Sequence, residues 1–255
     1  MSFAACAALV EKADPLRFRA AMAAPVPARR ILFPLYAFNI EVARAPWVTQ
    51  EPMIAEMRLQ WWRDALDEIG QGVTLRRHEV VDALAEVLDA EGAACLDGLI
   101  AARRWDIYKD AFEDQGHFDD YITATSGNLM WTAARLLGDA EESVVRDFAH
   151  AVGVANMFQA IPALQAQGRT PLLDGTPEGV RALAKAARDR MDRAARTRKA
   201  VSKASGAALV AGYHARPVLN AVLKSPALVA ADALDTNPAR DSLRFLNVSL
   251  RGWWR

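Results

Sequence analysis

The sequence has few cysteines, no net charge and no long apolar run. Among its 255 residues, only Cys6 and Cys95 are cysteines, which excludes a disulfide framework and a cysteine-rich zinc site. The 31 basic and 31 acidic residues cancel, so the whole molecule gives no electrostatic reason to bind nucleic acid. No window approaches the roughly eighteen uninterrupted apolar residues of a membrane span. These absences predict a cytoplasmic protein whose contact with a membrane, if any, is peripheral and at its inner face.

Strand signals and the common catalytic motifs are also absent. Alternating runs of β-branched and aromatic residues do not occur, whereas apolar residues recur at spacings of three and four. Glycines and prolines divide the chain into about ten such segments, and none of the breaks is long enough to be a linker. We therefore predict an all-α protein of about ten helices, with a single domain spanning residues 1–255.

No side chains are spaced for a familiar catalytic or metal site. The four histidines, His78, His117, His150 and His214, are isolated in the sequence and include no pair at metal-ligand spacing. Ser126-Gly127 lacks the surroundings of a nucleophile elbow, and no phosphate-binding glycine loop is present. The residues by themselves therefore predict no catalytic residue, no metal and no cofactor.

Several short motifs resemble the squalene/phytoene synthase family. They are LYAFN at 35–39, MRLQWWRDAL at 57–66, Asp120-Tyr121 followed by Ser126-Gly127, GVANMFQAI at 153–161, and Gly168-Arg169 with Pro171. The resemblance implies an isoprenoid-synthase-like helical bundle that encloses a prenyl groove. By position in these motifs, the expected groove-lining residues are Tyr36, Phe38, Trp61, Tyr121, Met157 and Gln159.

The resemblance also implies a metal site, and this sequence departs from it. Active members join two prenyl diphosphates head to head, using Mg²⁺ held by acidic motifs on two facing helices, because carboxylates are the ligands that Mg²⁺ prefers. The positions of the family's motif residues here carry Ile40, Ala43, Arg44 and Trp47 in the first motif, and Ala160, Ala163, Leu164 and Gly168 in the second. From Phe148 to Leu173 there is no acid at all. We therefore expect the usual condensation to be lost.

The residues that differ from the family's metal motifs also form a recognisable pattern. AFNIEVAR at 37–44, followed by MRLQWWRDAL and a second motif without aspartate, is similar to a branch of the family known in mitochondria for a complex I assembly factor. That resemblance implies a non-catalytic pseudoenzyme that assists the assembly of NADH:ubiquinone oxidoreductase. Its expected partners are complex I subunits or assembly intermediates.

Two alternatives stay open. One is an active prenyltransferase with a rearranged Mg²⁺ site built from Glu41, Asp106 and Asp110; the other is a module that holds an isoprenoid lipid in the groove without reacting it. Asp106, Asp110 and Asp114 recur at intervals of four, as on one face of a helix. The neighbouring basic residues equally favour an ordinary solvated stripe.

Two further features suggest interaction surfaces. Between Arg181 and Lys203 there are nine Lys or Arg residues against two Asp, which predicts a basic partner patch at Arg188, Arg190 and Arg193 for an acidic protein or an anionic membrane. At the end of the sequence, Trp253 and Trp254 must either pack back on the chain or stay exposed as a docking motif.

Overall fold

The computed structural model describes residues 2–73, 76–234 and 237–255, and it confirms the all-α prediction. Within these ranges the one β-bridge pairs Ala140 with Val201. The helix labels run to α15, beyond the ten or so expected, because turns as short as the four residues of α7 and α14 form separate helices. None of the helices in the described ranges combines the length and the apolar character needed to cross a bilayer.

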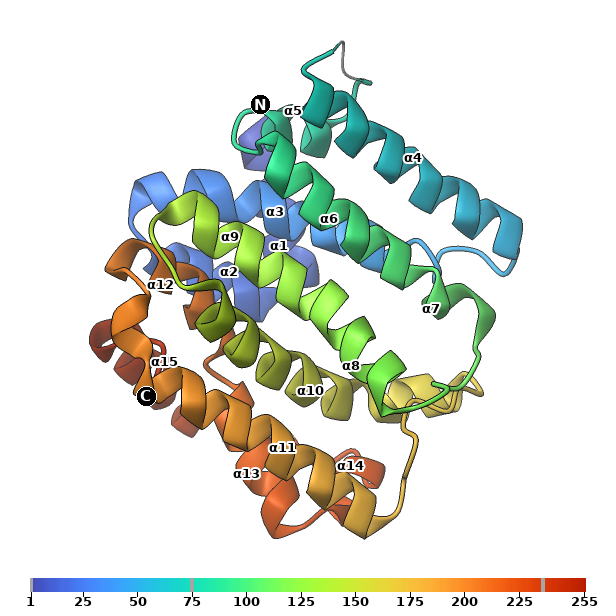
Figure 1. Ribbon diagram of the computed structural model, residues 1–255, viewed down its shortest axis with the longest axis vertical. Coiled ribbons are helices and arrows are strands. Elements are labelled where there is room, and N and C mark those ends of the chain that lie inside the picture. The colour runs from blue at the N-terminus through green and yellow to red at the C-terminus, as the bar shows by residue number, and fades with distance from the viewer. Residues whose placement is uncertain (1, 74–75, 235–236) are drawn as a thin grey trace.

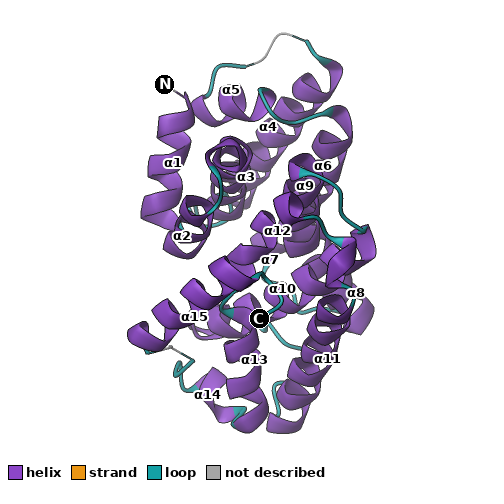
Figure 2. Ribbon diagram, turned by 90° about the vertical axis from the view of Figure 1, so that its left-hand side faces the viewer, coloured by secondary structure: helices purple, strands orange, loops and turns teal. Residues whose placement is uncertain are grey.

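The first part of the chain surrounds one buried helix. Figure 2 shows α3 end-on with its neighbours around it, and its core residues from Leu32 to Phe38 are buried on every side. A helix that is apolar all round is stable only in such a place. The helices of this part are α1 (Ser2–Ala13), α2 (Pro15–Ala23), α3 (Val26–Arg44), α4 (Pro52–Gln71), α5 (Glu79–Ala85) and α6 (Ala90–Arg103).

The middle of the chain continues a layer of helices that lie side by side. Figure 1 shows α4, α6, α9, α10 and α11 as successive neighbours, and each adjacent pair is in contact. A π-helical turn joins α8 to α9, and such turns are frequent at functional sites. The elements here are α7 (Trp105–Tyr108), α8 (Gln115–Ile122), η1 (Thr123–Gly127), α9 (Asn128–Leu137) and α10 (Glu142–Ala166).

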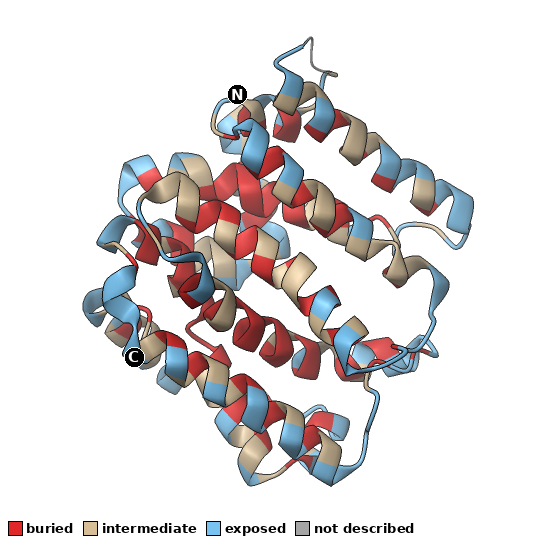
Figure 3. Cartoon of the chain, viewed as in Figure 1, coloured by how far each residue is buried: buried red, intermediate tan, exposed pale blue. Residues whose placement is uncertain are grey.

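The last part of the chain packs against α10 and returns toward the N-terminal helices. The α10 helix is mostly buried, and Figure 3 shows buried positions concentrated on it and on its neighbours. One hydrophobic cluster extends from Cys6 to Trp253, so both ends of the chain contribute to the core. The remaining elements are α11 (Pro177–Arg196), η2 (Arg198–Ala200), α12 (Lys203–Leu209), η3 (Val210–Gly212), α13 (Ala215–Lys224), α14 (Ala227–Ala230) and α15 (Pro238–Arg251).

Side-chain caps define where several of these helices begin. The carboxylate of Asp14 accepts a hydrogen bond from the backbone of Arg17 at the start of α2, and Asp89 does the same for Gly92 at the start of α6. Thr176 caps α11 directly before Pro177, a residue already shaped for the first helical position. These caps satisfy backbone donors that the first turn of a helix leaves unpaired.

The predicted stripe of aspartates does not form. Helix α7 ends at Tyr108 because Lys109 adopts a left-handed conformation, with φ of 59°, and this turns the chain out of the helix. Asp106 is buried, Asp110 is exposed in the following loop, and Asp114 caps α8. No continuous helix runs through these residues, so their spacing of four does not bring them to one face. The expectation that these three acids share one face was wrong.

Candidate functional site

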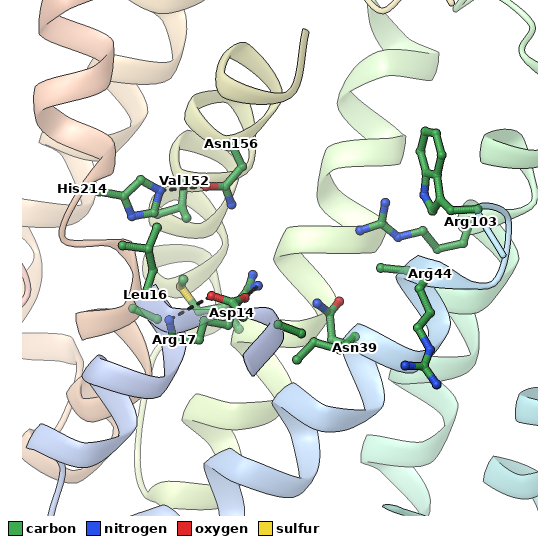
Figure 4. Close-up of a pocket in the computed structure, with 15 residues that line it drawn as sticks. Asp14, Leu16, Arg17, Asn39, Arg44, Arg103, Val152, Asn156 and His214 are labelled. Atoms are coloured by element: carbon green, nitrogen blue, oxygen red, sulfur yellow. Dashed lines mark hydrogen bonds and ion pairs between the residues drawn. The ribbon is translucent and has the colours of Figure 1, made fainter. Parts of the chain in front are cut away.

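Two hollows between α3 and α10 form the main candidate site. Their volumes are about 570 and 210 Å³, and they share the lining residues Arg17, Asn39, Trp47, Arg103 and Asn156. We call the two hollows together the α3–α10 cavity. Figure 4 shows its polar side chains converging from α2, α3, α6 and α10, while the guanidinium of Arg44 points away from them.

Most of the positions at which the family resemblance expects its motif residues face this cavity, whereas Ala163 and Gly168 are exposed and line neither hollow. Ile40, Ala43, Arg44 and Trp47 line the larger hollow, and Ala160 and Leu164 line the smaller one. The sequence register of both motifs is therefore consistent with the geometry. None of these positions brings a carboxylate to the cavity, and the guanidinium of Arg44, at one of them, points away and pairs with Glu41.

Among the residues that the structure describes, one acid lines each hollow, and both acids already have partners. Asp14, in the larger hollow, caps α2 and pairs with Arg17 at 2.6 Å. Asp106, in the smaller hollow, pairs with Arg103 at 3.0 Å and accepts a hydrogen bond from the Tyr121 hydroxyl at 2.9 Å. Arg103 also donates to the Tyr121 oxygen at 2.8 Å, so the three side chains form a closed network.

This network is buried and is covered by a second arginine. Burial raises the pKa of the Tyr121 hydroxyl, which keeps Tyr121 neutral and able to donate to Asp106. Arg169 donates to the backbone carbonyl of Asp106, and its guanidinium lies 5.0 Å from the ring of Trp47. The walls near Asp106 thus carry two guanidinium groups for one carboxylate.

The donor set of the cavity does not fit Mg²⁺. This ion takes near-octahedral oxygen ligands, usually including carboxylates that are free to bind it. Across residues 2–73, 76–234 and 237–255, no three His, Cys, Asp or Glu side chains gather as a metal-binding group. The proposed replacement ligands are not brought together either, because Glu41 pairs with Arg44 at 2.7 Å and Asp110 lies in an exposed loop.

The opposite wall of the larger hollow is polar but uncharged. The Nε2 atom of His214 lies 2.7 Å from the Oδ1 atom of Asn156, as Figure 4 shows. Burial, assisted by the positive charge of Arg17, lowers the pKa of His214 to about 4. His214 is therefore neutral near pH 7.

The expected groove-lining residues fall into two groups. Tyr121 and Met157 line the smaller hollow. Tyr36, Phe38 and Trp61 lie outside both hollows, because α3 and α4 use these rings to pack against other helices and against His78. Gln159 is exposed on the far side of α10, two residues from Met157 and therefore on another face.

Residues that the motifs did not indicate supply most of the polar lining. Asn156 stands inside the GVANMFQAI motif, whereas Arg17 and Arg103 look like ordinary surface arginines in the sequence. Their role depends on contacts between segments far apart along the chain, such as Arg103 with Tyr121. No spacing rule detects such a contact.

The predicted basic patch on α11 carries charges that are already paired within the chain. Arg193 makes two hydrogen bonds of 3.1 Å to Asp147, Arg190 pairs with Asp119, and Arg188 pairs with Asp192.

The two tryptophans near the C-terminus differ in burial. Trp253 is buried against Phe148, with ring centroids 4.9 Å apart, while Trp254 is partly exposed and lies next to Arg198. The Trp253-Trp254 pair is therefore anchored to the chain through Trp253, which is not free to dock elsewhere.

The all-α bundle has the isoprenoid synthase fold, as comparisons with known proteins show. The chain belongs to the squalene/phytoene synthase family, whose model matches residues 10–244. A dehydrosqualene synthase solved with a ligand superposes with a TM-score of 0.76 at 14% identity, covering 98% of this chain and 95% of that one. Squalene synthase HpnC from Alicyclobacillus acidocaldarius gives a TM-score of 0.68 at 18% identity, covering 88% of this chain and 93% of that one. At these identities the likeness concerns the fold.

A curated relative lies closer in sequence. It is the Drosophila melanogaster protein named NADH dehydrogenase (ubiquinone) complex I, assembly factor 6 homolog, which is 30% identical over 166 residues. The match covers 62% of this chain and 50% of that protein, so it spans about half of the relative's length.

Proposed function

We propose that this protein is a non-catalytic member of the squalene/phytoene synthase family that assists the assembly of respiratory complex I. The name of the Drosophila relative supports the assembly role. The lack of free carboxylates in the cavity supports the loss of catalysis. The expected partners of the protein are complex I subunits or assembly intermediates.

The observation that carries the proposal is the absence of free carboxylates at the positions that face the cavity. A prenyl diphosphate ionises only if the departing pyrophosphate is stabilised, and in this family Mg²⁺ ions supply that stabilisation. Here Ala43, Arg44 and Leu164 stand where acids would hold the ions. Burying the diphosphate without a matching set of cations would cost many kcal/mol.

Turnover is tested directly with the purified protein. We expect no release of pyrophosphate from farnesyl or geranylgeranyl diphosphate in the presence of Mg²⁺ or Mn²⁺, with an active squalene synthase run in parallel as the positive control. Release that depends on both the protein and the metal would contradict the proposal. It would favour the alternative of an active prenyltransferase with a rearranged metal site.

The assembly role is tested by deleting the gene. We expect the NADH oxidase activity of membranes to fall while carotenoid, hopanoid and sterol contents stay unchanged, and we expect the wild-type gene to restore the activity. Lost isoprenoids with intact NADH oxidation would contradict the proposal. A complementing copy carrying Arg44→Asp tests whether altering a metal-motif position in the cavity affects assembly; we expect it to complement.

The partner surface is proposed to be the basic patch at Arg188, Arg190 and Arg193. Arg193 keeps 54% of its side chain exposed despite its pairing with Asp147, so it is accessible to an acidic partner. Reversing all three charges is expected to abolish the capture of complex I intermediates. The matched control replaces the internal partners, Asp119, Asp147 and Asp192, with Asn, which breaks the same ion pairs but leaves the arginines in place. If both variants lose capture equally, the arginines act through folding and the patch is not the partner surface.

A second candidate function is the storage or presentation of an isoprenoid without reaction. The observation that favours it is the apolar part of the cavity lining, which includes Leu16, Ile40, Met130 and Met157. Native mass spectrometry of the protein taken directly from cells would detect a co-purifying hydrophobic molecule. We expect Ala160→Trp, which fills the smaller hollow, to release it.

A further inference from the structure

Helix α15 presents an apolar stripe to solvent. Leu243, Leu246 and Leu250 are 69%, 53% and 76% exposed, and their spacing of three and four places them on one face of the helix. On the opposite face Val248 is buried and Phe245 is partly buried against the rest of the chain. Three neighbouring leucines exposed to this degree are costly unless something covers them.

Arginines flank this stripe, and the acid of α15 is turned inward. Arg240, Arg244 and Arg251 follow one another along the helix beside the leucines. Across the described part of the chain, none of the three forms an ion pair with a carboxylate. Asp241 instead accepts a hydrogen bond from Tyr213 at 3.1 Å and pairs with Arg19 at 3.3 Å.

The surface on both sides of α15 is lined by cations. A hollow of about 850 Å³ lies between the end of α15, α2 and α12, and another of about 460 Å³ lies between α15 and α13. Among the residues that the structure describes, neither hollow is lined by an acid. The charged residues that line them are Arg198, Lys199, Lys203, Arg251, Arg216, Arg240, Arg244 and Arg255.

We propose that α15 docks this protein on the surface of a membrane that contains anionic phospholipids. The leucines would enter the boundary between headgroups and acyl chains, and the flanking arginines and lysines would contact the phosphates. This is the arrangement by which amphipathic helices bind membrane surfaces. Because the whole chain has no net charge, the attraction has to come from a local surface such as this one and not from the molecule as a whole. The inference is independent of the assembly role and of the α3–α10 cavity.

The charge complementarity and the leucine stripe point to a lipid surface in particular. A nucleic acid would use the cations but would leave the three leucines in water. An acidic protein could use the cations, but it would need a long apolar groove to cover leucines that stand on the outermost face of the helix. A bilayer can take up the leucines and bind the cations without a preformed groove.

Flotation with lipid vesicles tests the proposal on the full-length protein. We expect binding to vesicles of phosphatidylcholine mixed with phosphatidylglycerol to exceed binding to phosphatidylcholine alone by about ten-fold or more, and to weaken as salt screens the charges. Replacing Leu243, Leu246 and Leu250 together with Ser is expected to reduce binding about ten-fold or more. Charge reversal at Arg240, Arg244 and Arg251 is expected to remove the preference for the anionic lipid.

The matched control replaces another exposed apolar triplet, Met53, Ile54 and Met57 on α4, with Ser. These side chains are 75%, 45% and 66% exposed, so a general loss of surface hydrophobicity would affect both variants alike. We expect the control to float like the wild type, and circular dichroism checks that all variants are folded. Equal binding to neutral and anionic vesicles, or unchanged binding of the leucine variant, would overturn the proposal, as would retention by an acidic protein surface without any binding to vesicles.

Discussion

The guanidinium of Arg103 lies 3.0 Å from the carboxylate of Asp106 and neutralises the one acid that lines the smaller hollow. Asp106 comes from α7, the short helix that follows α6, and its side chain is 4% exposed. Both oxygens of this carboxylate are already hydrogen-bonded, Oδ2 to Arg103 and Oδ1 to Tyr121. The pair also makes the region sensitive to the loss of either partner.

Replacing Arg103 with Met tests how strongly Asp106 depends on the pair. Removing one partner of a buried ion pair leaves an uncompensated charge, so we expect the free energy of unfolding to fall by about 3–5 kcal/mol. Urea denaturation at pH 7 measures the change. The double variant Arg103→Met with Asp106→Leu is expected to be more stable than Arg103→Met alone. If the double variant is no more stable than Arg103→Met alone, the side chains are not coupled in this way.

The neutral state of His214 predicts a dependence of stability on pH. Its pKa falls from the ordinary 6.5 to about 4 in the folded protein, first because of burial and then because of Arg17. The unfolded chain therefore binds a proton more readily, so this contribution is fully present above about pH 6.5 and is lost as the pH falls toward 4. Between pH 7 and pH 4.5, we expect the wild type to lose about 2–3 kcal/mol more than His214→Gln.

Urea unfolding at the two pH values measures this difference. His117→Gln is the matched control, since His117 lies partly exposed on α8, away from the cavity. It should follow the wild type at both pH values. A His214→Gln variant that loses as much stability in acid as the wild type would show that His214 does not control this dependence.

The sequence predicts the helices and the placing of the motifs because both depend on local signals. Apolar spacing and caps indicate the helical class, and the register of the motifs brings Ala43, Arg44 and Leu164 to the cavity walls. The absence of acids at these positions is visible in the sequence and has a direct structural meaning.

What sequence reasoning misses depends on contacts across the fold. The pairing of Arg103 with Asp106 and Tyr121 joins three helices, and the charges of Arg190 and Arg193 in the α11 patch are satisfied by acids on other elements. The stripe expected at Asp106, Asp110 and Asp114 fails for a local reason of a different kind, the left-handed turn at Lys109. Periodicity assumes that a helix continues, and it does not detect such a turn in a residue other than glycine.

The close approach of α10 to the π-helical turn predicts a strict requirement for Gly153. A Cβ atom at this position would lie 2.6 Å from the Cγ2 atom of Ile122 and 2.8 Å from the Cβ atom of Ser126, so the helices would have to separate. We expect Gly153→Ala to lower the free energy of unfolding by about 1–3 kcal/mol. Gly175→Ala, where no atom lies within 4 Å, is the control and should be close to neutral. An equal effect of the two changes would contradict the tight packing.

The burial of Trp253 predicts that the last residues of the chain stabilise the fold. This side chain is 4% exposed, its ring packs edge-on against Phe148, and Gly206 lies directly beneath it. Large aromatic side chains in such sites contribute strongly to stability, so Trp253→Ala is expected to cost about 3–5 kcal/mol, measured by thermal and urea unfolding. Trp254→Ala removes a ring that is only partly buried and should cost clearly less. If the two variants were equally stable, Trp253 would not be packed in the core, and a docking role for the terminal pair would become the better interpretation.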